Sequence, residues 1–182
     1  MDDRLATTLA DIDAANGEDP NPLLVRGVVR PKALGEAELA TEWVRELLPQ
    51  PSDELLVAAR AHHLRRWAVP RSSYPEGRAS YLRWRRDMHE IHARDVASLM
   101  TRRGWEEAAI GRVQDLVRKT GLGKVDDPEM QALEDALCLV FIETQYDEIA
   151  HRLEDDKMAQ VVDKTLKKMS PRGRALAALL RG

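Results

Sequence analysis

Two histidines and one aspartate are the residues of this sequence best suited to metal chemistry. In helices, the rotation of about 100° per residue turns His63, His92 and Asp135 toward the apolar side of their segments. A buried, ionised carboxylate is unfavourable unless it is paired or bound to a metal ion. Two imidazoles and a carboxylate form a donor set for a divalent ion. We expect these side chains to converge on one metal site; the alternative is that neighbours satisfy each of them separately in the core.

Further candidates surround this expected centre. Glu36 lies on the same helix face as Ala40 and could supply a ligand. His62 is turned away from the apolar face, toward the arginines, but could complete the ligand set. Glu134 and Asp135 are the candidates for general acid or base catalysis, with an ion pair to an arginine as the alternative role of Glu134. The metal ion could be manganese, iron, zinc or magnesium.

An arginine cluster accompanies the histidines. Residues 60–86 contain eight arginines and one acid, a net charge of +7 in a chain whose net charge is −3. Arginine favours planar, bidentate recognition of phosphate or carboxylate. Such a local basic segment predicts a small anionic ligand rather than an extended nucleic-acid surface. The expected substrate-binding residues are Arg66, Arg71, Tyr74, Arg78, Tyr81 and Arg85. Alternatively, several of the arginines pair with the acidic rest of the chain.

Helices must position these residues. Helical periodicity recurs along the chain, and no segment shows sustained period-2 alternation. The expected fold class is all-α, a compact bundle of about seven helices in one domain over residues 1–182, with a core at about 36–150 and C-terminal helices at 156–180. The helix that carries His62 and His63 is predicted to run from Ser52 nearly to Pro70.

Composition limits the setting of the protein. The single cysteine, Cys138, forbids an internal disulfide and fits a reducing compartment. No run of 18 apolar residues is present, and the first residues carry acids where a signal peptide would carry bases. We therefore expect a cytoplasmic protein without a membrane partner. The sequence leaves open whether the chain forms homo-oligomers.

Three strings resemble the HD-domain superfamily. The segment "AARAHHL", the helix with His92 and the segment "LEDALCLVF" follow one another as in that superfamily. The resemblance implies an all-α fold that holds divalent metal for phosphoester hydrolysis, with Asp135 as the terminal aspartate. The sequence departs from the pattern, because the doublet is His62-His63 instead of His-Asp. No histidine precedes the doublet, so Glu36 would have to replace the usual first ligand.

A closer resemblance covers nearly the whole chain. The strings "RRWAVPRSSYPEGRASYLRWRRDMHEIHA", "LEDALCLVFIETQ" and "DDKMAQVVDKTLKKMSPRGR" are similar to domain-of-unknown-function family 4202. This family implies no function. The sequence as a whole thus predicts a divergent HD-like, metal-dependent hydrolase of a small phosphorylated or nucleotide-like substrate. The alternative is a non-catalytic nucleotide-, anion- or protein-binding module on a scaffold that has lost its metal.

Overall fold

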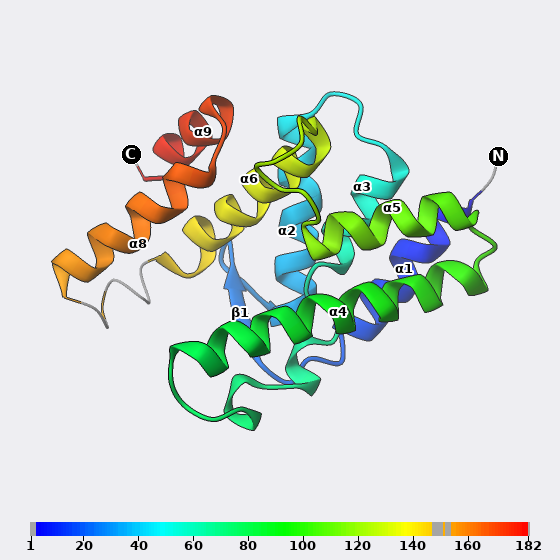
Figure 1. Ribbon diagram of the computed structural model, residues 1–182, viewed down its shortest axis with the longest axis horizontal. Helices are drawn as coiled ribbons and strands as arrows, with labels where there is room; N and C mark the ends of the chain where they lie inside the picture. Colours follow the sequence, from blue (N-terminus) through cyan, green and yellow to red (C-terminus); the bar gives the residue numbers. More distant parts are fainter. Residues whose placement is uncertain (1–2, 147–150, 152–153, 182) are drawn as a thin grey trace.

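The computed structural model describes residues 3–146, 151 and 154–181. In this part of the chain it contains eight α-helices and one two-stranded sheet, so the expected α-helical class is confirmed (Figure 1). The helices are α1 (Arg4–Asn16), α2 (Lys32–Leu47), α3 (Asp53–Ala61), α4 (Arg78–Arg102), α5 (Glu107–Arg118), α6 (Pro128–Thr144), α8 (Asp155–Lys168) and α9 (Pro171–Arg181). Within the described residues, no helix is both long and apolar enough to span a membrane.

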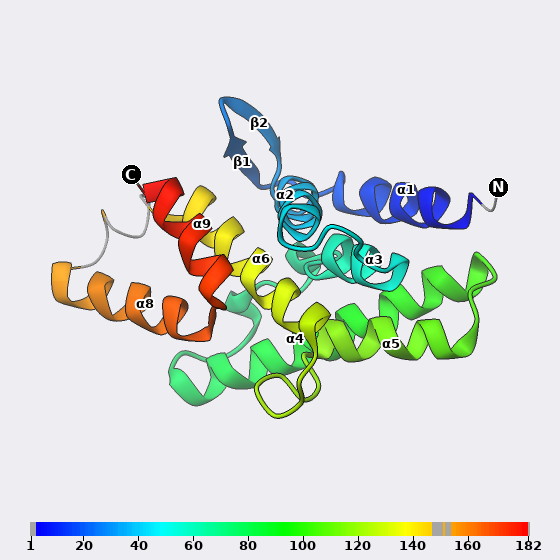
Figure 2. The ribbon, with the colours of Figure 1, turned by 90° about the horizontal axis from the view of Figure 1, so that it is seen from above.

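A β-hairpin between α1 and α2 was not predicted. Strands β1 (Pro22–Val25) and β2 (Val28–Pro31) pair antiparallel, and Figure 2 shows them projecting from the helices beside α2. Arg26 and Gly27 turn the chain with φ of 47° and 84°, the backbone that a tight two-residue hairpin requires. Strands of four residues are too short to show a clear alternation, which is why the sequence pattern concealed them.

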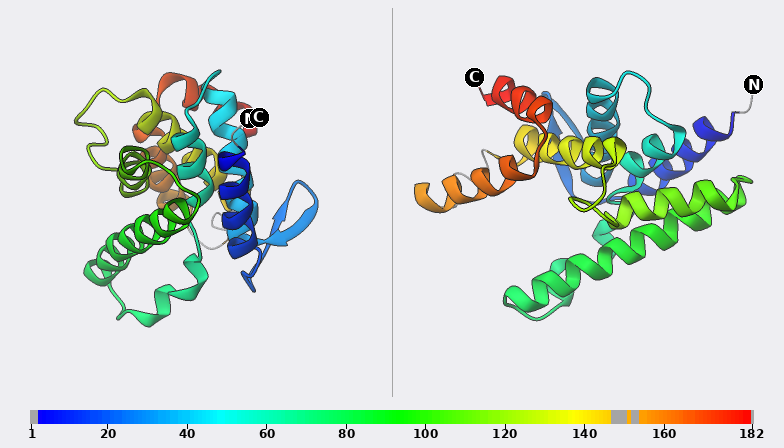
Figure 3. Two further views of the ribbon diagram at one scale, coloured as in Figure 1. Left: turned by 90° about the vertical axis from the view of Figure 1, so that its right-hand side faces the viewer. Right: turned by 45° about the horizontal axis from the view of Figure 1, so that its top comes forward.

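Helices α2, α3 and α6 pack against one another in the middle of the molecule. Leu39, Leu55 and Leu139, one from each helix, are almost fully buried there. The long helix α4 and its partner α5 cover one side, while α8 and α9 contact α6 on another (Figure 3). Helix α6 therefore has buried residues on several faces, as its apolar sequence predicts.

Helix α3 ends earlier than the sequence pattern indicates. It stops at Ala61, and the chain continues through turns and a 3₁₀ segment over Arg66–Ala68. Arg65 adopts a left-handed backbone with φ 53°, and its amide donates to the side-chain oxygen of buried Asn16 at 3.1 Å. A left-handed arginine needs such support, because its side chain disfavours that conformation. This turn presents the two histidines that follow α3.

The start of α2 is fixed by a carboxylate from outside the helix. Asp19 accepts hydrogen bonds from the amide of Ala33 at 2.8 Å and from the amide of Asn21 at 2.9 Å. The bond to Ala33 satisfies one of the amides that a helix start leaves without an intrahelical partner. Asp19 thereby holds the first turn of α2, one turn before Glu36.

Helix α9 is attached to α6 through Asp135. Its carboxylate accepts hydrogen bonds from the Ser170 amide, the Ser170 hydroxyl and the Gln131 side chain. The Ser170 hydroxyl oxygen in turn accepts from the amide of Gly173. Asp135 is almost fully buried, and these bonds supply the partners that a buried carboxylate requires.

Replacement of Gly173 by alanine should destabilise the protein. A β-carbon at this position would lie 2.6 Å from the carboxyl carbon of Asp135. We expect Gly173→Ala to lower the free energy of unfolding by about 1–3 kcal/mol, the usual cost of overpacking. Urea denaturation measures this. The matched control is Gly111→Ala in α5, where nothing lies within 4 Å and a small gain in stability is expected. Equal stabilities of the two variants would contradict this account of α9.

Candidate functional site

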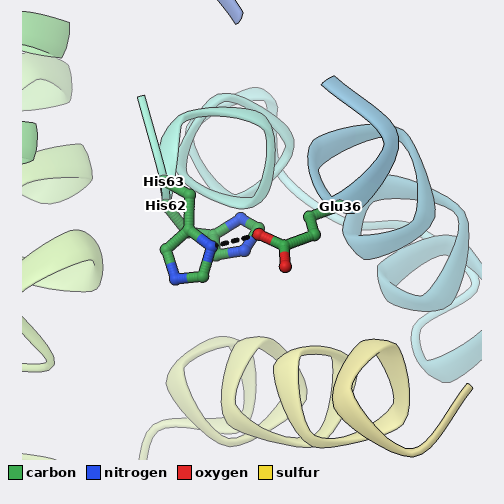
Figure 4. Close-up of side chains that lie close together, drawn as sticks. All are labelled: Glu36, His62 and His63. Atoms are coloured by element: carbon green, nitrogen blue, oxygen red, sulfur yellow. Dashed lines mark hydrogen bonds and ion pairs between the residues drawn. The ribbon is translucent and has the colours of Figure 1, made fainter. Parts of the chain in front are cut away.

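Glu36, His62 and His63 form the cluster at the centre of the candidate site. Each offers one ligand atom, and the three atoms lie within 4.8 Å of one another. Figure 4 shows Glu36 on α2 facing the two imidazoles that follow α3, with a hydrogen bond of 2.6 Å between His63 Nδ1 and Glu36 Oε2. The second Glu36 oxygen accepts from Gln145 Nε2 at 3.0 Å. The suggestion that Glu36 could join the histidines thus agrees with the geometry.

Burial sets the protonation of this cluster. It raises the pKa of Glu36 and lowers the pKa of both His62 and His63 well below the usual value. The neutral His63 ring donates its Nδ1–H to Glu36 and keeps a lone pair on Nε2, which points away from Glu36 (Figure 4). His62 donates Nδ1–H to the Ala59 carbonyl at 2.8 Å, so its Nε2 also keeps a lone pair.

The predicted orientation of His62 was wrong. It was expected to point away from the core, yet only 7% of the residue is exposed. The expectation extended the rotation of α3 past its last residue. Because α3 ends at Ala61, the turns that follow direct both His62 and His63 toward Glu36.

The predicted convergence of His63, His92 and Asp135 was also wrong. Asp135 is buried, as expected, but its oxygens are bonded to Gln131 and Ser170 on the side of α6 that faces α9. It belongs neither to the cluster of potential ligands nor to the cavity lining. Periodicity showed that Asp135 is buried, but a helix with several buried faces can turn a carboxylate toward more than one neighbour.

His92 is buried next to the cluster without belonging to it. Its ring centre lies 6.2 Å from that of His63. The Nδ1–H donates to the Leu64 carbonyl at 2.8 Å, which holds the turn after α3 against α4. The other ring nitrogen, Nε2, is buried and has no hydrogen-bond partner among the described residues. His92 is therefore best assigned a role in positioning the turn that carries His63.

A cavity of about 350 Å³ opens at the cluster. The side chains that line it include Glu36, His62 and His63, and also Arg66, Tyr81 and Arg85 of the predicted binding set. Neither Arg66 nor Arg85 forms an ion pair with a described residue; their guanidinium groups lie near the rings of Trp84 and Tyr81, at 4.5 and 5.9 Å from the ring centres. Unpaired guanidinium groups beside buried histidines favour an anionic occupant.

The other three predicted binding residues lie outside this cavity. Arg71 donates to the carbonyls of Tyr74, Pro75 and Gly77, and it therefore stabilises the loop before α4. The Tyr74 hydroxyl donates to Asp87 at 2.8 Å. Arg78 is exposed at the first position of α4. Sequence proximity grouped these residues with Arg66, but the loop carries them away from the cavity.

Several cavity residues were not singled out as site residues from the sequence. Lys119, at the end of α5, pairs with Glu134 on the cavity wall. Its left-handed backbone, with φ 59°, is unusual for a lysine. His89, Gln145 and Lys168 also line the cavity. Together with Lys119, these residues lie in or at the ends of four different helices, so no local sequence pattern connects them.

The residues present fit a divalent metal ion. Two imidazoles and one carboxylate are a donor set typical of zinc, iron and manganese sites. The depressed histidine pKa values keep the ligands unprotonated at neutral pH, as metal binding requires. The hydrogen bond from His62 to the Ala59 carbonyl orients that ring, an arrangement common around metal ligands. Glu36, His62 and His63 are thus the residues that would hold the ion.

The buried histidines predict a loss of stability in acid. Burial lowers the pKa of His92 to about 3, whereas the unfolded chain titrates near 6.5. The unfolded state therefore binds more protons between these values, and stability falls as the pH drops below about 6.5. In chelator-treated protein, we expect His92→Gln to reduce the stability loss between pH 7.5 and pH 5 by about 2 kcal/mol. Urea denaturation at both pH values measures this.

The variant Gly111→Ala, which changes no ionisable side chain, provides the control for that experiment. This variant should retain the full pH dependence. If His92→Gln and the wild-type protein lose the same stability on acidification, His92 does not titrate as its burial indicates.

Comparisons with known proteins identify a family for almost the whole chain. No curated protein and no solved structure matches the sequence, so the resemblance to HD domains is not confirmed. The family model described as "Domain of unknown function (DUF4202)" matches residues 6–181. That range includes every residue of the cluster and of the cavity lining. The chain is a member of the DUF4202 family.

Proposed function

We propose that the protein is a metal-dependent hydrolase of a small phosphorylated substrate. The observation that carries the proposal is the Glu36–His62–His63 cluster, which lies at a cavity. Arg66 and Arg85 line this cavity and form no ion pair with a described residue. A bound divalent ion would lower the pKa of a water molecule and polarise a phosphoryl oxygen. The unpaired Arg66 and Arg85 would bind the remaining phosphoryl oxygens and stabilise the charge that develops on them.

Glu134 and Lys119 are the groups proposed to move protons. Hydrolysis forms a bond between the water oxygen and phosphorus, and it breaks the bond from phosphorus to the leaving oxygen. Glu134 takes the proton that the water loses, and the Lys119 ammonium donates a proton to the leaving oxygen. The hydrogen bond between the two side chains then returns the proton from Glu134 to Lys119. Both residues line the cavity outside the cluster of potential ligands.

Metal binding tests the cluster directly. In equilibrium dialysis of protein purified without a histidine tag, we expect about one equivalent of manganese or zinc in the wild-type protein. Glu36→Gln and His63→Gln should weaken binding at least about tenfold, because each removes a ligand. His89→Gln is the matched control, since His89 lines the same cavity outside the cluster. Loss of binding in the control alone, or no binding by the wild type, would refute the metal site.

Phosphate release tests the catalytic assignment. We expect metal-dependent release of inorganic phosphate from some member of a panel of phosphomonoesters. Glu134→Gln should lower kcat about 100-fold or more while metal binding persists, because it removes the proton acceptor. Arg85→Gln should raise KM and also lower kcat, because Arg85 binds the phosphoryl group and stabilises the charge that develops on it. Tm measurements on each variant establish that it is folded. A Glu134→Gln protein with full activity would exclude Glu134 from proton transfer.

One observation favours a second candidate, the non-catalytic anion-binding module. The carboxylates at the cavity already have internal partners, since Glu36 bonds to His63 and Gln145 while Glu134 pairs with Lys119. Such a cavity is arranged to hold an anion without a metal. Binding of inorganic phosphate in the presence of a chelator, combined with no phosphate release on addition of any divalent metal, would select this alternative.

A further inference from the structure

A second cavity, of about 460 Å³, adjoins the central one. Glu36 and Arg66 line both cavities, so these two side chains form the boundary between them. The second cavity, here called the side pocket, is otherwise lined from the segment before α2, the first turn of α2, the segment between α3 and α4, and α4 itself. A ligand in either cavity could therefore contact Arg66.

Aromatic rings distinguish the side pocket from the central cavity. Trp67 and Trp84, two of the four tryptophans of the chain, line it. The Trp84 ring is already in contact with the guanidinium group of Arg66, and its Nε1–H donates to the Val69 carbonyl. The Nε1–H of Trp67, in contrast, is buried and has no acceptor among the described residues. The contribution of Trp67 to the side pocket is therefore its ring rather than its N–H group.

The charged groups of the side pocket differ in whether they already have partners within the protein. Asp19 uses both oxygens for the start of α2 and for Asn21, and Glu36 uses both of its oxygens for His63 and Gln145. Arg66 has no hydrogen bond and no ion pair to a described residue, although burial lowers its pKa by disfavouring the charged form. The boundary between the two cavities thus has an unpaired cation, and the side pocket combines two indole rings with Lys32, whose side chain forms no ion pair with a described residue.

We propose that the substrate is a nucleotide whose base lies beside Trp67 in the side pocket and whose phosphoryl group lies on Arg66 in the central cavity. The inference rests on the proposed function for the phosphoryl end of the ligand. Every nucleobase presents a flat π-face for stacking, which suits a pocket lined by indole rings. A single ligand would then occupy both cavities and neutralise the unpaired guanidinium group between them.

The test compares nucleotides with the same phosphate group lacking a base. Isothermal titration in the presence of a chelator prevents turnover while Kd is measured for AMP, GMP, CMP, UMP and ribose 5-phosphate. We expect at least one nucleotide to bind about tenfold or more tightly than ribose 5-phosphate. Trp67→Ala should abolish this preference and leave the affinity for ribose 5-phosphate unchanged.

Two further variants guard against trivial effects. Trp67→Phe retains a ring, so it should retain part of the nucleotide preference even if Trp67→Ala folds poorly. Trp105→Phe is the matched control, because the Trp105 side chain bonds to Thr8 and lines neither of the two cavities. It should bind every ligand as the wild type does.

The outcomes separate this inference from the proposed function. Equal affinities for the nucleotides and ribose 5-phosphate would overturn the inference, even if phosphate release is observed. Tighter binding of fructose 1,6-bisphosphate than of any nucleotide would also overturn it, since the side pocket would then hold a second anion. Binding of a nucleotide that depends on Trp67, without hydrolysis in any metal, would support the inference and refute the proposed catalysis.

Discussion

The buried carboxylate of Glu36 is the constraint on which the centre of this structure depends. A carboxylate removed from water must find hydrogen-bond donors, and here His63 and Gln145 supply them from the end of α3 and the end of α6. Three segments distant in the sequence therefore meet at one side chain. The same arrangement fixes the His63 tautomer and the orientation of its ring beside Glu36.

A second group of interactions holds the turn that presents the histidines. Asn16 in α1 accepts a hydrogen bond from the amide of the left-handed Arg65. His92 in α4 donates a hydrogen bond to the Leu64 carbonyl of the same turn. Asp19 fixes the start of α2 from the loop after α1. These polar residues lie outside the cluster, and each determines the position of a segment that contributes to it. The cluster is thus supported on several sides, as a site that must keep its geometry requires.

The arginines of residues 60–86 have two different roles in the structure. Arg71 stabilises its own loop through three carbonyls, whereas Arg66 and Arg85 form no ion pair with any residue that the structure describes. An arginine with saturated donors contributes rigidity, and one with free donors remains available to a ligand. The high local density of arginine in the sequence therefore combines a scaffold with a binding surface.

The sequence by itself determined the α-helical class and most helix positions, because helical periodicity, proline and glycine act locally. It also identified Glu36, His62, His63, Arg66 and Arg85 as candidates for one site. Only the tertiary structure decided which candidates meet. The early end of α3 turned His62 inward, and the contact between α6 and α9 took Asp135 away from the histidines. Periodicity shows that a residue is buried, but the packing of other helices decides which neighbour it faces.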